Sequence, residues 1–480
     1  MADMGRIMWA VMMVTLAAGV QGSHGANQGN GQASLLVLTT LNTNPDPAAG
    51  PLGSALSVLD VERGHLHVFP FLTMEGGPVT GQAMHTALTP DNRKVYVTMG
   101  GNRTLPLRMV VIDLTWRDRI PSPRVIKSLE MVPSGTPGNE ANGASCHPGM
   151  PGIRQEGHGT RITADGRFLT VSELQNDRVH ILDTATDRFV GPPMVHRDLV
   201  APHGLYPNPA GTLAAAPQYW FDQNGVSVWN IEPENGALSY HSTVRLEHEE
   251  LRGAYLHTVR WLDDQRFFTN ATQERHQGDG SSEQAVWLVD LEQGTTRAVL
   301  DADDILEGVS DVELANGKLY VAEGNVAQLL AGEQAPGYLS VWSLEDPSAP
   351  TFLRRLSAGE GLPETFSNAH GLAASADGRH LFVESFSSNF LIEVDTNDDS
   401  VARVFSGADK LNGTHVSTAL TPIQLPAAAI NAASSSTASS SRGFSGNLGV
   451  PASIPCSLSA ALTVAGSPLD RMNRKIGSCL

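Results

Sequence analysis

The feature that most constrains this chain is an internal repeat with a period of about forty to sixty residues. Each unit contains short β-rich runs bounded by Gly, Asp, Asn or Pro, and none has helical periodicity. A single four-stranded sheet cannot bury both of its faces, whereas sheets stacked radially around an axis can do so. The repeat therefore predicts an all-β fold, a β-propeller of about seven blades.

The last blade of this propeller is expected to be shared between the two ends of the chain. Residues 34–70 supply three β-rich runs with no first strand before them. Residues 414–422 resemble the HTALTP run, residues 85–90, that opens the first complete unit. We therefore expect a seven-bladed β-propeller over residues 33–425, closed by pairing of N- and C-terminal strands.

The two ends of the chain differ from the repeat in composition. Arg6 precedes an apolar run over residues 7–20, and small residues follow, a pattern typical of a secretory signal peptide over residues 1–25. An uncleaved anchor is the alternative. The pattern predicts a secreted or periplasmic protein that has no membrane association after cleavage. Residues 426–480 are rich in Ala and Ser and predict a disordered tail.

Charge and cysteine content exclude several classes of protein. Fifty acidic residues against 32 basic ones give a net charge of -18, which disfavours nucleic acid as a partner and leaves a small-molecule substrate. The three cysteines, Cys146, Cys456 and Cys479, are too few for a disulfide framework. Asn102, Asn270 and Asn412 each begin an N-x-T sequon, relevant only in a host that glycosylates. The oligomeric state is not indicated.

A histidine recurs at the start of the first strand in five of the six complete units. These residues are His85, His158, His203, His257 and His370. The first strand of a propeller blade is innermost, so equivalent positions should form a ring around the channel. Neutral imidazoles are ligands of copper, iron and zinc, and the recurrence predicts a transition-metal site, with copper or iron favoured over zinc. Asp311 in the fifth unit and His415 in the shared blade are additional candidate ligands.

Three glutamates are candidate partners of these histidines. Glu173, Glu323 and Glu384 lie where the second strand of a unit returns beside the first. A metal-bound histidine generally donates its outer N–H to such a group, which predicts that these carboxylates orient the imidazoles. The alternative is that the histidines are structural and join consecutive blades through hydrogen bonds.

Two further segments supply candidates for a lid or a substrate pocket. Cys146 and His147 lie in a Gly- and Pro-rich loop over residues 131–157, and long loops in compact domains are often functional. Tyr219 and Trp220 follow the second strand of the third unit. An ordinary loop and packing between blades are the respective alternatives. G-x-S-x-G and H-E-x-x-H motifs are absent from the sequence.

The runs LTPDNRKVYVTMG, ITADGRFLTVSE and ASADGRHLFVES resemble the YVTN-type repeat. That repeat belongs to a propeller superfamily that includes nitrous oxide reductase, the haem d1 nitrite reductases and lactonase-type propellers. The ring of channel histidines is similar to the copper site of nitrous oxide reductase and to the metal site of selenium-binding, methanethiol-oxidase-like proteins. It is also similar to the iron site of carotenoid oxygenases. The resemblance implies His85, His158, His203, His257 and His370 as ligands, but no cupredoxin-type domain accompanies them.

Three functional hypotheses follow. The leading one is a secreted metalloprotein, an oxidoreductase that uses a channel metal to activate oxygen or a small substrate. The second is a non-enzymatic binding or scaffold propeller in which the histidines hold the blades together. The third is a metal-independent lactonase-type hydrolase that uses a channel His and Glu as acid and base.

Overall fold

The computed structural model describes much of the repeat region. It describes residues 34–40, 55–60, 65–70, 82–91, 93–100, 106–117, 120–132, 157–174, 176–218, 225–246, 254–273, 285–301, 303–324, 336–375, 377–385, 390–406 and 420–424. The chain divides into two compact units, residues 1–430 and 431–480, and all described residues belong to the first. The predicted signal peptide and the predicted tail lie outside the described residues.

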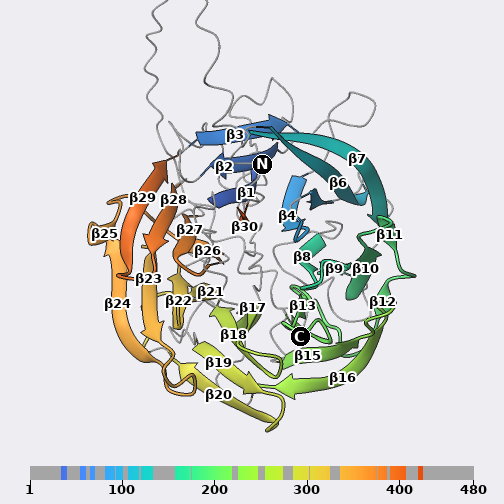
Figure 1. The fold of residues 1–480 in the computed structure, drawn as a ribbon. Coiled ribbons are helices and arrows are strands. Elements are labelled where there is room, and N and C mark those ends of the chain that lie inside the picture. Colours follow the sequence, from blue (N-terminus) through green and yellow to red (C-terminus); the bar gives the residue numbers. More distant parts are fainter. Residues whose placement is uncertain are drawn as a thin grey trace, which may run out of the picture. The chain divides into compact units, whose positions relative to one another are not determined.

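The first unit is an all-β β-propeller with six complete blades, each built on consecutive antiparallel strands; in addition, β25 pairs parallel to β24 and β12 pairs with β10 (Figure 1). Their strands, blade by blade, are β4 (Gln82–Leu88), β5 (Lys94–Gly100), β6 (Leu107–Arg117) and β7 (Ile120–Val132); β8 (Gly157–Ile162), β9 (Phe168–Glu173) and β10 (Arg178–Asp183) with β11 (Arg188–Phe189) and β12 (Met194–Val195); β13 (Tyr206–Pro207), β14 (Leu213–Pro217), β15 (Gly225–Ile231) and β16 (Leu238–Arg245); β17 (Ala254–Trp261), β18 (Arg266–Gln273), β19 (Ala285–Asp290) and β20 (Thr295–Leu300); β21 (Val309–Ala315), β22 (Lys318–Glu323), β23 (Tyr338–Ser343), β24 (Thr351–Ala358) and β25 (Gly361–Leu362); β26 (Ala369–Ala374), β27 (His380–Ser385), β28 (Phe390–Asp395) and β29 (Ser400–Ser406).

A further sheet joins the two ends of the repeat region. It has the order β3–β2–β1–β30 and contains β1 (Ser34–Thr40), β2 (Ala55–Asp60), β3 (His65–Pro70) and β30 (Leu420–Gln424). β30 runs antiparallel to β1, with Ser34 opposite Gln424. A C-terminal strand therefore pairs with N-terminal strands, as predicted, although it begins at Leu420 and not at residue 414. The complete blades number six, one fewer than the seven predicted, because the remaining sheet is composite.

The turn between the first and second strands explains one recurrent motif. In the run TADGR, the hydroxyl of Thr163 donates to Asp165 Oδ1 (2.6 Å), and the same oxygen accepts the N–H of Arg167 (3.0 Å). Gly166 takes a left-handed φ of 73°, which glycine adopts without steric cost. The same hydrogen bonds recur at residues 89–93 and 375–379, so the repeated letters encode a repeated turn.

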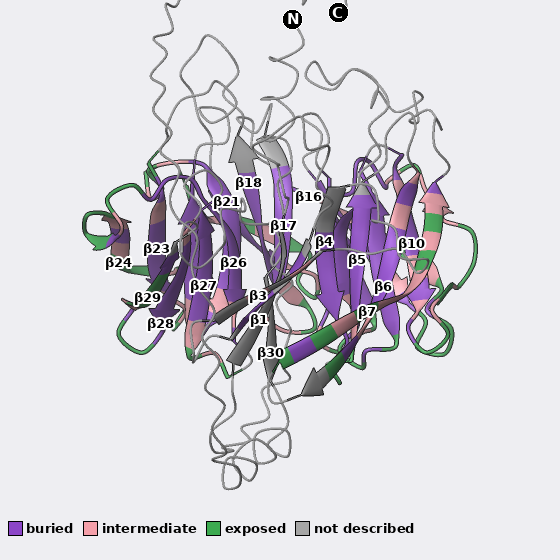
Figure 2. Cartoon of the chain, turned by 90° about the horizontal axis from the view of Figure 1, so that it is seen from above, coloured by how far each residue is buried: buried purple, intermediate pink, exposed green. Residues whose placement is uncertain are grey.

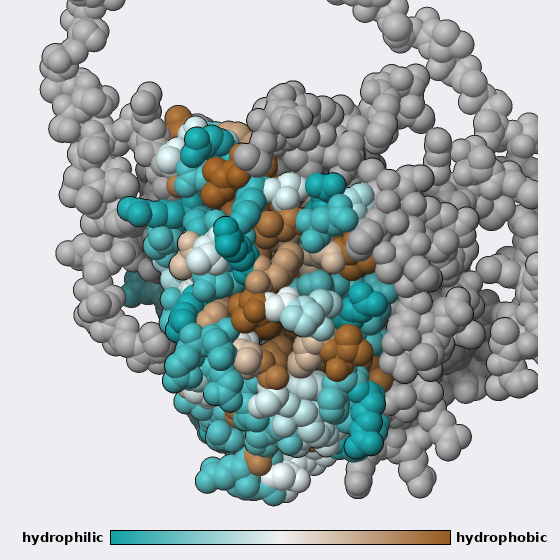
Figure 3. All heavy atoms as spheres, turned by 90° about the vertical axis from the view of Figure 1, so that its right-hand side faces the viewer, coloured by the Kyte–Doolittle hydropathy of each residue, from teal (hydrophilic) through white to brown (hydrophobic). Residues whose placement is uncertain are grey.

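Burial decreases from the inner strands to the outer ones (Figure 2). Every residue of β9 is buried, whereas β16 and β24 contain mainly exposed or half-buried residues. On the side seen in Figure 3, apolar side chains form patches among hydrophilic ones. The core lies between neighbouring blades, where apolar side chains of adjacent sheets pack together.

No helix in the described part of the chain has the length and apolar character needed to cross a membrane.

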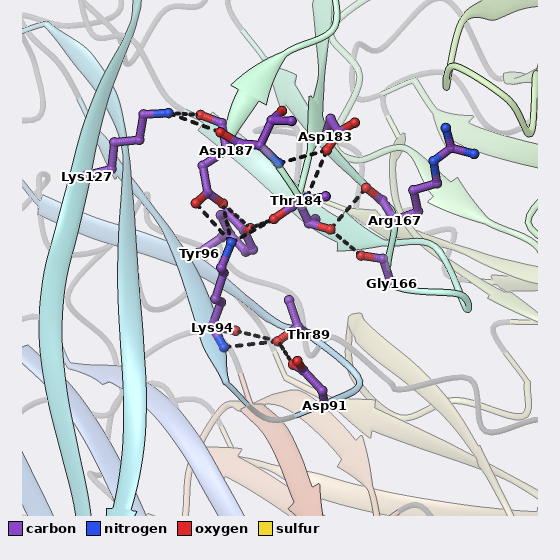
Figure 4. Close-up of polar contacts among 12 residues, drawn as sticks. Thr89, Asp91, Lys94, Tyr96, Lys127, Gly166, Arg167, Asp183, Thr184 and Asp187 are labelled. Carbon is purple, nitrogen blue, oxygen red and sulfur yellow. Dashed lines mark hydrogen bonds and ion pairs between the residues drawn. The ribbon is translucent and has the colours of Figure 1, made fainter.

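Polar clamps join neighbouring blades near their outer edges. In the first clamp, Lys94 and Tyr96 of β5 bind the carboxylate of Asp187 in the next blade, at 2.9 and 2.6 Å (Figure 4). The second repeats this arrangement, with Lys318 and Tyr320 of β22 binding Asp399 at 2.7 and 2.6 Å. These two clamps explain why Lys-x-Tyr starts the second strand in two of the units.

Candidate functional site

The five recurrent histidines come together at the inner strands, and we call them the histidine cluster. His85, His158, His257 and His370 belong to β4, β8, β17 and β26, and His203 precedes β13. Each is at most 2% exposed. Their ring centroids are 5.0 Å apart for His85–His158, 4.9 Å for His158–His203, 4.2 Å for His203–His257 and 5.8 Å for His257–His370. The imidazoles therefore follow one another from blade to blade.

A β-bulge lies at the histidine in four of the inner strands. The pairing of inner and second strands shifts register between Ala83 and Thr86, His158 and Arg161, Leu256 and Val259, and Ala369 and Leu372. A bulge inserts extra residues into one strand and changes the direction in which its side chains point. In these four strands the side chains at the bulge therefore point in directions that a regular pleated strand would not give them. The periodicity of the sequence did not predict the bulges.

Glycines next to three of the histidines allow close packing. A Cβ on Gly159 would lie 2.2 Å from Gly204 Cα in the next blade, and one on Gly204 would lie 2.5 Å from the Tyr206 ring. Gly371 packs against the carboxyl group of Glu384. At Gly159 and Gly204 the position after the histidine therefore has no room for a side chain, whereas a Cβ at Gly371 would make ordinary van der Waals contact.

Side chains of the second strands hold the bulges in place. Thr98 accepts the N–H of His85 at 3.0 Å, and the hydroxyl of Ser172 donates to the carbonyl of His158 at 2.8 Å. Asn270 accepts the N–H of Thr258 at 3.1 Å and donates to the carbonyl of Val309 in the next blade at 2.8 Å. Asn270 is fully buried, so this sequon serves the fold rather than a glycan.

Burial favours the neutral form of four histidines of the cluster, His85, His203, His257 and His370. Burial, followed by the charges of neighbouring histidines, holds the pKa values of His85 and His203 well below the usual 6.5. Burial and the proximity of His370 do the same to the pKa of His257, and burial lowers the pKa of His370 to about 4. Neutral imidazoles each keep one basic nitrogen, so they can accept a proton or bind a cation.

Contacts within the cluster run from one blade to the next. The backbone of His257 raises the pKa of His203, and the backbone of Ser310 raises that of His257; both effects partly offset the lowering by burial. His85 Nε2 lies 3.3 Å from His158 Nδ1. A hydrogen bond of this kind fixes the tautomer and orientation of an imidazole.

Two of the three predicted glutamate partners bind elsewhere, which corrects the sequence-based prediction. Glu173 contacts His180 and accepts from Asn176 at 2.8 Å. Glu323 binds Arg355 at 3.2 Å and the N–H of Leu306 at 2.8 Å. Side chains alternate faces along a strand, and Glu173 follows Ser172, whose hydroxyl contacts the His158 backbone. The sequence correctly predicted that Glu173 and Glu323 lie at the ends of their second strands, but it did not determine on which face of the sheet each side chain lies.

The third glutamate lies beside the cluster. Glu384 is fully buried next to Gly371, and within the described residues neither of its carboxyl oxygens has a hydrogen-bond partner. Burial, with a contribution from Asp311, raises the pKa of Glu384 well above its usual value. The raised pKa favours the protonated form of this carboxyl group, which lies next to Gly371, the residue that follows His370.

A buried ionic group, which the repeat pattern did not predict, accompanies the histidines. Arg260 binds Asp311 at 3.2 Å and Glu313 at 3.1 Å. Asp311 also accepts the N–H of Leu372 at 3.1 Å. Burial raises the pKa of Asp311 to about 6 against the opposing effect of Arg260. Asp311, predicted as an additional ligand, is instead an ion-pair partner, because the cation three residues after His257 neutralises it.

Several predicted site residues lie outside the described residues. They are His415, Cys146, His147, Tyr219 and Trp220. Among the residues that are described, no three His, Cys, Asp or Glu side chains are arranged to hold a metal ion as they stand.

Comparison with known proteins identifies the fold. No family model matches the chain, and no curated protein matches its sequence. Among solved structures, a periplasmic gluconolactonase of Pseudomonas aeruginosa has a TM-score of 0.52 and 15% identity over 82% of this chain and 99% of that one. A candidate 6-phosphogluconolactonase of Bacteroides fragilis has a TM-score of 0.53 and 11% identity over 83% and 99%. These likenesses show the fold alone.

A third similar structure has no established role. It is a functionally unknown protein of Desulfotomaculum acetoxidans, with a TM-score of 0.52 and 12% identity over 82% of this chain and 100% of that one. The chain is a β-propeller. Its membership of the superfamily named for the YVTN-type repeat stays a prediction.

Proposed function

We propose that this chain is a hydrolase of lactones or related esters, with its reaction centre at the histidine cluster. The observation that carries the proposal is Glu384, a buried carboxyl group with a raised pKa and no hydrogen-bond partner among the described residues, next to Gly371 in the inner strand that carries His370. A buried polar group without a partner costs stability, and such exceptions concentrate at functional sites.

The raised pKa of Glu384 and the lowered pKa values of His85, His203, His257 and His370 are in the directions that ester cleavage requires. A neutral imidazole of the cluster takes a proton from the attacking nucleophile as it adds to the carbonyl carbon. Glu384 gives its proton to the ring oxygen as the C–O bond breaks, and the imidazolium then returns a proton to Glu384. Paired groups whose environments drive their pKa values apart are typical of acid–base catalysis.

The similar structures support this choice of substrate class. The Pseudomonas aeruginosa protein is a periplasmic gluconolactonase, and the Bacteroides fragilis protein is a candidate 6-phosphogluconolactonase. We propose a lactone of a sugar acid as the first substrate to test. We infer hydrolysis itself from Glu384 and the imidazoles of this chain, because the shared fold hosts many functions.

The test is the replacement Glu384→Gln, which keeps the size of the side chain and removes its acidic proton. We expect kcat/KM for glucono-1,5-lactone to fall by about 100-fold or more at neutral pH, with the thermal unfolding midpoint retained. The matched control is Glu323→Gln, which changes a buried glutamate engaged by Arg355 and Leu306. Equal rates for the wild-type and Glu384→Gln proteins would refute the role of this acid.

A second candidate function is transition-metal binding by the histidine cluster, and the spacing of the imidazoles favours it. Metal–nitrogen bonds of about 2.0–2.1 Å place two tetrahedral ligand nitrogens roughly 3.4 Å apart. His85 Nε2 and His158 Nδ1 are 3.3 Å apart. The remaining imidazoles would have to rotate, because no three described side chains already form such a group. His203 and His257 would be the nearest further ligands, and copper or iron the metals expected.

Metal analysis of tag-free protein separates the two candidates. Metal binding predicts about one equivalent of copper, iron or zinc per chain, which would be lost in a His158→Gln variant. Less than about a tenth of an equivalent, with no gain after reconstitution, would reject it. Hydrolysis that persists in a chelator would favour the first proposal.

Two features of the whole chain also remain proposals. We propose that the composite sheet β3–β2–β1–β30 acts as a seventh blade, since β30 contacts both β26 and β4, the inner strands on its two sides. We further propose export, on the basis of the apolar N-terminal segment over residues 7–20. N-terminal sequencing of the mature protein tests export, and a start at Met1 would contradict cleavage.

A further inference from the structure

The fifth complete blade breaks the pattern of the histidine cluster. Its inner strand, β21, contacts β17, which carries His257, and β26, which carries His370. β21 has no histidine. Its bulge lies between Val309 and Asp311, so Ser310 is the residue left unpaired, as the bulge residues are in the neighbouring inner strands. A serine therefore stands at the gap in the cluster.

We infer that Ser310 is the nucleophile of the proposed hydrolase, attacking the carbonyl carbon in place of a water molecule. The inference rests on the proposed function. Ser310 is 1% exposed, and its hydroxyl has no hydrogen-bond partner among the described residues. A serine hydroxyl can both donate and accept, and a buried one normally finds a partner. A hydroxyl that serves no structural hydrogen bond is free to react.

The backbone around Ser310 is fixed on both sides. Asn270 of the preceding blade donates to the carbonyl of Val309 at 2.8 Å. Asp311 accepts the N–H of Leu372 from the following blade at 3.1 Å and is itself held by Arg260 at 3.2 Å. These contacts hold the bulge before any substrate arrives, which is what a catalytic nucleophile requires.

Imidazoles lie on both inner strands that contact β21, His257 on β17 and His370 on β26. The backbone of Ser310 is near enough to the imidazole of His257 to raise the pKa of that ring, against the larger lowering by burial. The imidazole of His370 lies 5.8 Å from that of His257, centroid to centroid, at an interplanar angle of 84°. The hydrogen bond between nucleophile and base is often long in a substrate-free enzyme and tightens when substrate binds.

The reaction has two balanced steps. In the first, Ser310 Oγ bonds to the carbonyl carbon and its proton passes to a flanking imidazole. The ring C–O bond breaks, the ring oxygen leaves with the proton of Glu384, and the imidazolium returns a proton to Glu384. In the second, water adds to the serine ester and gives its proton to the imidazole. The C–Oγ bond then breaks, and Ser310 regains a proton from the imidazolium.

The experiment compares full-length wild-type protein with Ser310→Ala and Thr160→Val. Thr160 is the matched control, since it is another fully buried inner-strand residue whose hydroxyl has no hydrogen-bond partner in the described part of the chain. Each protein is treated with phenylmethylsulfonyl fluoride, a probe that forms a bond from serine oxygen to sulfur as fluoride leaves. Mass spectrometry of peptides locates the adduct, and hydrolysis of glucono-1,5-lactone and p-nitrophenyl acetate is measured in parallel.

We expect one adduct at Ser310 in the wild-type and Thr160→Val proteins and none in Ser310→Ala. Hydrolysis by Ser310→Ala should fall at least about 100-fold while its unfolding midpoint is kept, because the lost hydroxyl made no hydrogen bond. Wild-type rates in Ser310→Ala would overturn the nucleophile and leave the hydrolase with direct attack by water. A wild-type protein that hydrolyses neither substrate but is labelled at Ser310 would overturn the substrate class alone. No hydrolysis and no label would overturn both.

Discussion

Backbone strain lies two residues before two of the clustered histidines. Ala201 has a φ of 40° and precedes His203, and Asn368 has a φ of 48° and precedes His370. The left-handed conformation costs a residue such as alanine about 1–2 kcal/mol. The N–H of Ala201 donates to Asp177 Oδ1 at 2.6 Å. A carboxylate in the neighbouring turn therefore offsets the strain in the segment that leads into His203.

Substitution of Asp177 tests this arrangement at the scale of one residue. Asp177→Ala removes the acceptor and places alanine at a φ of 51°, so we expect the free energy of unfolding to fall by about 2–3 kcal/mol. Asp177→Asn keeps an acceptor oxygen and a residue that tolerates this conformation, and should cost less than about 1 kcal/mol. Urea denaturation measures both. Equal losses in the two variants would contradict the role given to the hydrogen bond.

At the scale of elements, the blades are joined by polar contacts as well as by apolar packing. Asp187 and Asp399 have φ values of 50° and 57°, and each receives a lysine and a tyrosine from the preceding blade. The hydrogen bond to Asp187 and burial raise the pKa of Tyr96, so its hydroxyl stays a donor over the physiological range. The side chains that meet in the clamp come from neighbouring blades and not from neighbouring positions in the chain.

Removal of either clamp carboxylate should weaken the fold. Asp187→Ala and Asp399→Ala leave a buried tyrosine hydroxyl and a half-buried lysine without their partner, and we expect each to lower the free energy of unfolding by about 2–3 kcal/mol. The two clamps join different pairs of blades, so the double variant should lose the sum to within about 0.5 kcal/mol. The control is Asp398→Ala, whose fully exposed side chain joins no clamp. A loss equal to that of the control would contradict the prediction.

At the scale of the whole molecule, the buried histidines link stability to pH. Burial depresses the pKa values of His85, His203, His257 and His370. The unfolded chain takes up protons below about pH 6.5, whereas the folded chain does not, so stability is lost as the pH falls toward 4. The raised pKa values of Glu384 and Asp311 act in the opposite direction, because the folded state keeps protons that the unfolded state releases. Four groups with lowered pKa values outnumber two with raised ones, so unfolding in acid takes up protons on balance.

We therefore expect the free energy of unfolding to fall as the pH is lowered from about 6.5 to 5, by about 1.4 kcal/mol per pH unit for each net proton taken up on unfolding. Urea denaturation at several pH values measures the slope. His203→Gln removes one titrating group. The number of protons taken up on unfolding should therefore fall by about one, and the slope by about 1.4 kcal/mol per pH unit. A stability that is constant over this range, or that rises in acid, would contradict the neutral state of the cluster.

The repeated turn, the strands around it and the recurrence of histidine at one position could all be predicted from the amino-acid sequence. These are local properties, since Thr163, Asp165 and Gly166 make their turn within a few residues, and a shared repeat position places His158 and His370 on inner strands. The tertiary structure decided the partners of the charged groups. Glu173 turned toward His180, Asp311 toward Arg260 of the preceding blade, and Glu384 toward Gly371. The physical reason is that a repeat fixes depth in the sheet, whereas the face of a strand and the contents of the adjacent blade depend on bulges and packing between residues far apart in the chain.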